Sequence, residues 1–175
     1  QISPFLDGNP RPNRFLYSKR SWVKFAEQTQ AEQKSAYPIH VKYNTGLNRI
    51  GFDPNETDWV LGQLKNSPFQ IKSVYTHLGQ TESPKPDAAT DRQIELFNPI
   101  MHKHNAATEQ MPEYHLLNTS GVFNYPELHL DWVRVGIGLY GFGNDKDETS
   151  ELKNTHTLSS IISDFIFHIC STQSL

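Results

Sequence analysis

The run His40-Val41-Lys42-Tyr43-Asn44-Thr45-Gly46-Leu47-Asn48-Arg49-Ile50-Gly51-Phe52 decides the fold that this sequence is expected to adopt. It begins as an apolar strand from Ile39 and then breaks into a loop that holds Arg49. Enzymes built on parallel strands keep their functional groups just past the carboxyl ends of those strands, which is where Arg49 stands. Lys42 lies inside the strand, where a buried ammonium is costly unless it is paired or chemically altered. The alternative is that Lys42 occupies a solvated strand edge and Arg49 caps a helix.

Outside this run, predicted strands and helices alternate along the chain. Strands are expected at residues 14–17, 39–43, 70–77, 114–118 and 131–135, and helices at 21–36, 55–66 and from 90 onward. Ser18 or Ser21 could cap the first helix, and Pro99 should kink or break the third. Such alternation is typical of βα units and a parallel sheet. Because candidate groups follow four separate strand ends, a barrel is favoured over an open sheet. We therefore predict an α/β fold, a partial TIM (β/α)8 barrel of about five βα units.

Composition narrows the classes of function. The chain has 175 residues, with 16 Lys and Arg against 19 Asp and Glu, and it carries no basic or acidic run. Neither a nucleic acid nor a membrane surface is therefore an expected partner. The single cysteine, Cys170, excludes an internal disulfide framework and suits a reducing cytosol. No stretch is apolar and long enough for a signal peptide or a membrane span.

Two histidines near the end of the third predicted helix are candidate metal ligands. His102 and His104 are two residues apart, so they point to different helix faces and are poor partners for one ion. We interpret both as solvated, and we expect no metal site.

The segment from Gly136 to Gly141 matches the dinucleotide pattern G-x-G-x-x-G. A dinucleotide loop must open an amphipathic helix, whereas this one runs into the polar segment Phe142–Glu148. We reject that interpretation. The glycines still allow backbone N–H groups to approach a phosphate closely.

Four segments, in order, resemble those of the alanine racemases, pyridoxal-phosphate enzymes of fold type III. Residues 42–51 resemble the signature K-x-[DN]-T-G-[ML]-x-R-[IL]-G, with Asn44 and Leu47 where the family more often has Asp and Met. Residues 75–78, 115–121 and 134–141 resemble three later motifs, and the resemblance covers residues 13–163.

The resemblance implies a pyridoxal 5′-phosphate site. Gly136 and Ile137 would bind the cofactor phosphate through their amides, together with Asn118 and with Thr119, which stands where the family usually has Ser. Arg134 would face the pyridine nitrogen of the cofactor. Since arginine keeps its proton at ordinary pH, that nitrogen would stay unprotonated and side reactions such as transamination would be disfavoured.

The same resemblance gives roles to four further residues. His77 would lie near the cofactor ring and support the arginine that faces it. Arg49 would contact the substrate carboxylate and the cofactor phenolic oxygen, and Leu47 would line the substrate site. Lys42 matches a lysine that is carbamylated in many members. Carbamylation would turn a buried cation into an anion able to orient Arg49.

Two catalytic groups of the family have no counterpart in this sequence. No K-x-N-A-Y-G run, which would carry the Schiff-base lysine, occurs in the chain, and the opposing tyrosine belongs to the family's C-terminal domain. We expect a connector at 1–13, a partial barrel domain at 14–150, and the start of a C-terminal β domain at 151–175. Residues 152–163 resemble that domain's entry, whereas the sequence from 164 onward departs from the family.

We therefore expect a fragment of an alanine racemase that is inactive by itself. The full enzyme would be a homodimer in the bacterial cytoplasm, interconverting L- and D-alanine for peptidoglycan synthesis by two-base proton exchange. Fusion behind a muramoyl-peptide ligase is compatible with the sequence. A serine or other amino-acid racemase, or a non-catalytic pyridoxal-phosphate-binding barrel, are the alternatives. A basic amino-acid decarboxylase is disfavoured by Arg134, and residues 152–163 speak against the non-catalytic barrel.

Overall fold

The computed structural model describes residues 14–32, 36–82 and 88–155. Within them, a four-stranded parallel sheet has the order β1-β2-β3-β4, so each strand pairs with its predecessor in the chain. The strands are Arg14–Leu16 (β1), Tyr37–Lys42 (β2), Phe69–Tyr75 (β3) and Glu113–His115 (β4). This order is that of a barrel segment, in which consecutive βα units add neighbouring strands. The predicted α/β fold of a partial barrel is confirmed.

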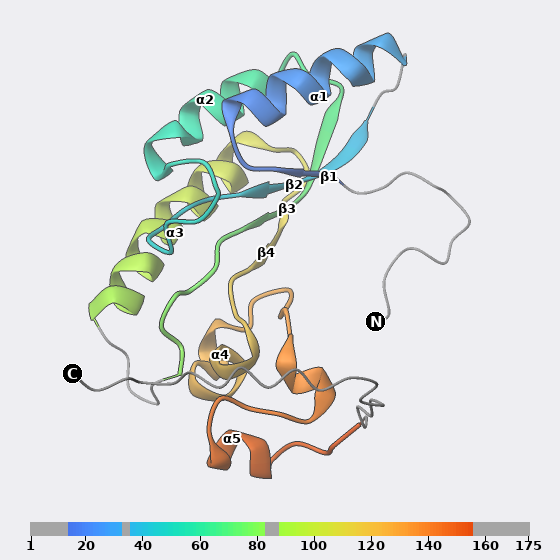
Figure 1. The fold of residues 1–175 in the computed structure, drawn as a ribbon. Coiled ribbons are helices and arrows are strands. Elements are labelled where there is room, and N and C mark those ends of the chain that lie inside the picture. The colour runs from blue at the N-terminus through green and yellow to red at the C-terminus, as the bar shows by residue number, and fades with distance from the viewer. Residues whose placement is uncertain (1–13, 33–35, 83–87, 156–175) are drawn as a thin grey trace, which may run out of the picture.

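Three helices connect these strands and lie together on one side of the sheet (Figure 1). They are Lys19–Ala31 (α1), Thr57–Leu64 (α2), which follows the 3-10 turn Pro54–Glu56 (η2), and Ala88–Ala107 (α3). The shorter elements that follow β4 form a separate group at its carboxyl end (Figure 1). These are Thr119–Asn124 (α4), Pro126–Leu128 (η3), Ile137–Tyr140 (η4) and Lys146–Ser150 (α5). No helix in the part of the chain that the structure describes has the length and apolarity needed to cross a membrane.

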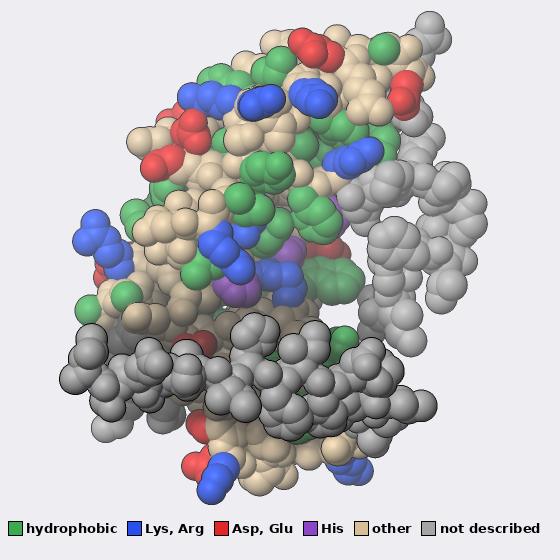
Figure 2. All heavy atoms as spheres, in the orientation of Figure 1, with side chains coloured by type: hydrophobic (Ala, Val, Ile, Leu, Met, Phe, Trp, Pro, Cys, Tyr) green, Lys and Arg blue, Asp and Glu red, His purple; other side chains and the backbone are tan. Residues whose placement is uncertain are grey.

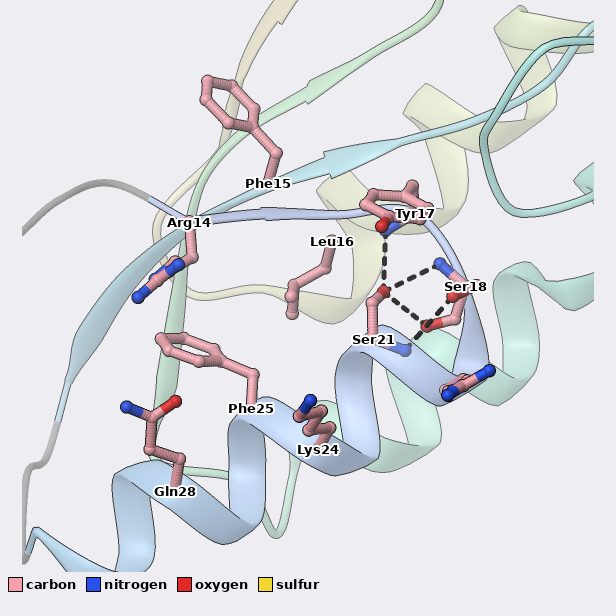
Figure 3. Close-up of a pocket in the computed structure, with 10 residues that line it drawn as sticks. Arg14, Phe15, Leu16, Tyr17, Ser18, Ser21, Lys24, Phe25 and Gln28 are labelled. Atoms are coloured by element: carbon pink, nitrogen blue, oxygen red, sulfur yellow. Dashed lines mark hydrogen bonds between the residues drawn. The ribbon is translucent and has the colours of Figure 1, made fainter.

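The first helix starts two residues earlier than predicted and ends at Ala31 rather than at residue 36. Ser18 and Ser21 both take part in its start (Figure 3). The Ser18 hydroxyl accepts a hydrogen bond from the Ser21 amide at 3.1 Å, and the Ser21 hydroxyl accepts one from the Ser18 amide at 3.0 Å. Ser18 is therefore the N-cap of a reciprocal capping box.

Aromatic side chains hold the helices on the sheet. Trp22 of α1 is fully buried, and its ring centre lies 5.2 Å from that of Phe69 on β3 and 6.1 Å from that of Trp59 on α2. Phe52, which lies 6.5 Å from Trp22, closes this cluster from the loop after β2. One tryptophan thus links two helices and the sheet.

The prediction of a fifth strand at residues 131–135 is wrong, because these residues do not form a strand. Only Trp132 forms a β-bridge, parallel to His115, while the Asp131 and Arg134 amides donate to the carbonyls of Tyr114 and Leu117 at 3.1 and 3.0 Å. Leu130, immediately before this segment, has φ +49°. Pro99 does not interrupt α3 either, since the helix runs through it and buries Phe97 and Ile100 on both sides of it.

The prediction of a solvated His104 is also wrong, whereas His102 is exposed as expected. Residues 90, 93, 97, 100 and 104 of α3 are buried, a helical spacing that places His104 on the inner stripe. Its Nε2 lies 3.0 Å from the Tyr43 hydroxyl, and its Nδ1 has no hydrogen-bond partner among the described residues. Burial lowers the pKa of His104 to about 4, so the ring is neutral at pH 7.

A buried neutral histidine makes stability depend on pH. The unfolded chain binds a proton at His104 near pH 6.5, whereas the folded chain does so only near pH 4. The stabilisation is therefore complete above pH 6.5 and is lost as the pH falls toward 4, by about 3 kcal/mol. We expect His104→Gln to remove this share of the pH dependence, as measured by urea unfolding between pH 7 and 4. His102→Gln, the exposed control, should keep the wild-type slope; equal slopes for both variants would contradict the assignment.

The domain boundaries predicted at residues 14 and 150 stay a prediction. The expected connector at 1–13 lies outside the described residues. So does most of the segment expected to open a second domain, from residue 156 onward.

Candidate functional site

Arg134 lies beyond the carboxyl ends of β3 and β4 and is surrounded by hydrogen-bond acceptors. Its Nη2 donates to the Thr76 carbonyl at 2.7 Å and to the Leu116 carbonyl at 3.4 Å, and its Nη1 donates to Nδ1 of His115. Its guanidinium carbon lies 4.9 Å from the centre of the Tyr75 ring. Burial lowers the pKa of Arg134 to about 10, which still leaves it a cation at pH 7.

His115 is a site residue that the sequence reasoning missed. It ends β4, and its ring stacks on Tyr75 at 4.6 Å between ring centres. Burial and then the Arg134 cation lower the pKa of His115 to about 3. The strand was predicted at 114–118, which put His115 near its start, so the strand-end rule that singled out Arg49 did not point to it.

His77 follows β3 and approaches Arg134 from the other side. Its Nδ1 lies 3.3 Å from Nη2 of Arg134. Burial is the main cause that lowers the pKa of His77 to about 4, and the Arg134, Arg49 and Lys42 cations add to it. The structure thus brings together at one edge of the sheet Arg49, His77 and Arg134, which come from three separate connections.

Lys42 is buried with 7% of its surface exposed, so the solvated-edge alternative is wrong. Its ammonium lies 5.9 Å from the centre of the Tyr75 ring. Burial, then the Arg49 and Arg134 cations, lower its pKa. No acidic side chain is paired with Lys42 among the residues that the structure describes.

The loop that carries Arg49 has a fixed backbone. The Asn48 amide donates to the Asn44 side chain at 2.8 Å, and Asp53, rather than Arg49, caps the helical turn that follows. Gly51 has φ +144°, and a Cβ there would lie 2.5 Å from the Tyr43 backbone, so the loop requires glycine. Arg49 is exposed, while Leu47 is half-buried and contacts the neighbouring loop at Gly79.

The predicted phosphate cradle is organised by Thr119. Its hydroxyl oxygen accepts hydrogen bonds from the amides of Gly136 at 3.1 Å and Gly138 at 3.3 Å. The amide of Gly138, rather than that of Ile137, thus joins Gly136 in converging on this oxygen. Asn118 caps α4 through the Gly121 amide and accepts the Thr81 hydroxyl at 2.6 Å, so its side chain oxygen serves to fix the loop.

Cations and neutral histidines dominate this region, and both side-chain types gather in the middle of the face shown in Figure 2. The ion pairs of the described residues, Lys19–Glu56 and Lys103–Asp58, lie elsewhere and leave Arg134 without an acidic partner. In the described ranges, no group of three His, Cys, Asp or Glu side chains could hold a metal ion. The arrangement suits a ligand with two negative groups, such as a phosphate and a carboxylate.

Comparison with known proteins gives one consistent family. Residues 16–143 match the model of the alanine racemase N-terminal domain. Alanine racemase 2 of Clostridium acetobutylicum is 32% identical over 141 residues, covering 79% of this chain and 35% of that protein. The serine/alanine racemase of Enterococcus gallinarum is 32% identical over 69% of this chain and 18% of its own length.

The solved structures agree on the fold. An alanine racemase of Clostridium difficile 630 superposes with a TM-score of 0.71 at 23% identity, over 81% of this chain and 37% of that one. The chain thus spans about a third of the length of alanine racemase 2 of Clostridium acetobutylicum, a curated relative. The matched domain covers most of the sequence, and the chain belongs to the alanine racemase N-terminal domain family.

Proposed function

We propose that this chain supplies the cofactor- and substrate-facing part of a pyridoxal-phosphate-dependent racemase that interconverts L- and D-alanine. The observation that carries the proposal is the surroundings of Arg134. This half-buried cation has hydrogen-bond acceptors on both sides, two of them on histidines whose pKa values are far below 7. Such a group can stand beside a pyridine nitrogen without giving up its proton.

The donors present fit a phosphorylated cofactor. The amides of Gly136 and Gly138 already donate to the Thr119 hydroxyl oxygen, so the predicted donation from Gly136 to the phosphate would pass through Thr119, whose own hydrogen stays available for an anion. The Ile137 amide lies between them in the sequence, and space is open where a Gly136 side chain would stand. When bound, pyridoxal phosphate supplies an electron sink that eases removal of the α-proton of an amino acid.

In this proposal Arg134 limits the strength of that sink. Because Arg134 remains a cation, it would donate a hydrogen bond to the pyridine nitrogen of a bound cofactor and would transfer no proton to it. With the ring nitrogen kept unprotonated, the bound cofactor would withdraw electrons less strongly, and return of a proton to the α-carbon would be favoured over side reactions. His77 and His115 hold the guanidinium between them and, being neutral, add no further positive charge.

Arg49 and Lys42 lie in the part of the proposed site that would bind the amino-acid substrate. Arg49 binds the carboxylate of the amino acid, and Leu47 lines the same site. Burial and the two flanking cations lower the pKa of Lys42, which raises the fraction of neutral amine that can add carbon dioxide. The carbamate that results is an anion placed to orient Arg49.

In the cell, we propose that the whole protein is a homodimer of the bacterial cytoplasm and provides D-alanine for peptidoglycan. Serine or another small amino acid is the second candidate substrate. Similarity to the serine/alanine racemase of Enterococcus gallinarum supports this second candidate. A chiral assay on alanine and serine separates the two substrates in the complete protein.

Titration of the chain with pyridoxal phosphate tests the site directly. Thr119→Val should raise the dissociation constant at least about tenfold, because losing a hydrogen bond to a charged group costs roughly 1.5–3 kcal/mol. Thr29→Val is the matched control, since it removes a buried hydroxyl that bonds only within α1, to the Phe25 carbonyl at 2.7 Å. Pyridoxal without phosphate should bind weakly and equally to all three proteins. Absence of saturable binding by the wild-type chain would overturn the proposal.

A further inference from the structure

A row of hydrogen-bonded side chains crosses the sheet on the face away from the helices and ends at Arg134. His40 of β2, Ser73 of β3 and His115 of β4 belong to three adjacent strands. Nδ1 of His40 lies 2.6 Å from the Ser73 hydroxyl, and the same hydroxyl lies 2.9 Å from Nε2 of His115. Nδ1 of His115 then faces Nη1 of Arg134.

The direction of every hydrogen bond in this row follows from its last member. A guanidinium has donors and no acceptor, so Nδ1 of His115 must accept. His115 is therefore neutral, with its proton on Nε2, and it donates to Ser73. The Ser73 hydroxyl, having accepted that bond, gives its single hydrogen to Nδ1 of His40. His40 must then carry its own proton on Nε2.

The burial of His115 and Ser73 favours this arrangement of hydrogen bonds. Ser73 is 1% exposed and His115 is 8% exposed, so bulk water offers little competition as an acceptor for Nε2. His40 is held by its own contact, since its ring stacks on Phe15 at 5.1 Å between centres. The ring of His115 is fixed in the same way against Tyr75. Both imidazoles can change which nitrogen carries the proton without moving.

We propose that Ser73 and His40 are positioning residues that hold His115 in its Nε2–H tautomer and thereby keep an acceptor aimed at Arg134. Without them, His115 is free to place its proton on Nδ1, and two donors then face each other at Arg134. The part of this inference that concerns the pyridine nitrogen rests on the proposed function. The tautomer of His115, by contrast, depends only on contacts within this chain and not on a cofactor.

Ring-nitrogen NMR of the ¹⁵N-labelled chain, recorded without cofactor, measures which nitrogen of each histidine carries the proton. We expect His115 and His40 to be Nε2–H tautomers at pH 7. Ser73→Ala should raise the Nδ1–H fraction of His115 roughly tenfold, the size expected for the loss of one hydrogen bond to a buried donor. Ser73→Thr, which keeps the hydroxyl, should restore the wild-type tautomer, and Thr29→Val should leave it unchanged.

His40→Phe provides a second test that does not depend on Ser73→Ala folding. It keeps the stacking on Phe15 but removes the acceptor for the Ser73 hydroxyl, so the hydroxyl can turn toward His115 and raise the Nδ1–H fraction. A wild-type Nδ1–H tautomer, or an unchanged His115 in both variants, would overturn the inference. Titration with pyridoxal phosphate is a separate arm: wild-type tautomers without cofactor binding would overturn the proposed function and leave the positioning role intact.

Discussion

D-alanine is expected to form no faster when the 175-residue chain is added to pyridoxal phosphate and L-alanine than with the free cofactor alone. The sequence holds no K-x-N-A-Y-G run, so no lysine in it has the context of the family's Schiff-base lysine. The chain also covers 35% of alanine racemase 2 of Clostridium acetobutylicum. The opposing tyrosine that the resemblance implies would belong to a C-terminal domain. Proton exchange on both faces of the α-carbon needs both bases.

A chiral assay of D-alanine tests this expectation, with alanine racemase 2 of Clostridium acetobutylicum as the positive control. Lys42 is the lysine that the structure buries beside Arg49 and Arg134, so Lys42→Ala is the informative variant. Turnover well above that of the free cofactor, abolished by Lys42→Ala, would show that we have misplaced the catalytic lysine.

Trp22→Ala is expected to lower the free energy of unfolding by about 3–5 kcal/mol, the range for deleting a fully buried large aromatic side chain. Trp22 is 1% exposed and contacts Phe69 on β3, Trp59 on α2 and Phe52 after β2. Its removal therefore loosens α1, α2 and the sheet at the same time. Urea unfolding followed by circular dichroism gives the free energy without relying on tryptophan fluorescence.

Val23→Ala is the matched control for this substitution. Val23 is the next residue of α1 and is 46% exposed, so its truncation should change the free energy of unfolding by less than about 0.5 kcal/mol. A Trp22→Ala variant as stable as Val23→Ala would mean that the aromatic cluster does not hold the helices on the sheet.

The sequence by itself determined the order of the four strands and of the three long helices, and it placed Arg49 and His77 just past strand ends. These features depend on local signals: apolar runs that make strands, helical periodicity, and glycines such as Gly51, which the loop after β2 requires. Because the strands are parallel, strand ends that follow one another in the sequence must meet at one edge. The sequence is therefore sufficient to group Arg49 and His77 at that edge, whereas Arg134 reaches it from a segment that is not a strand.

The tertiary structure alone decided which side chains touch. His40, Ser73, His115 and Arg134 are far apart in the chain, and only the register of the strands places them in one row. His104 is paired with Tyr43 because α3 turns that face onto the sheet. Residues 131–135 have the composition of a strand, but only Trp132 among them forms a β-bridge. Pairing between distant segments depends on the geometry of the assembled sheet, which no local pattern in the chain encodes.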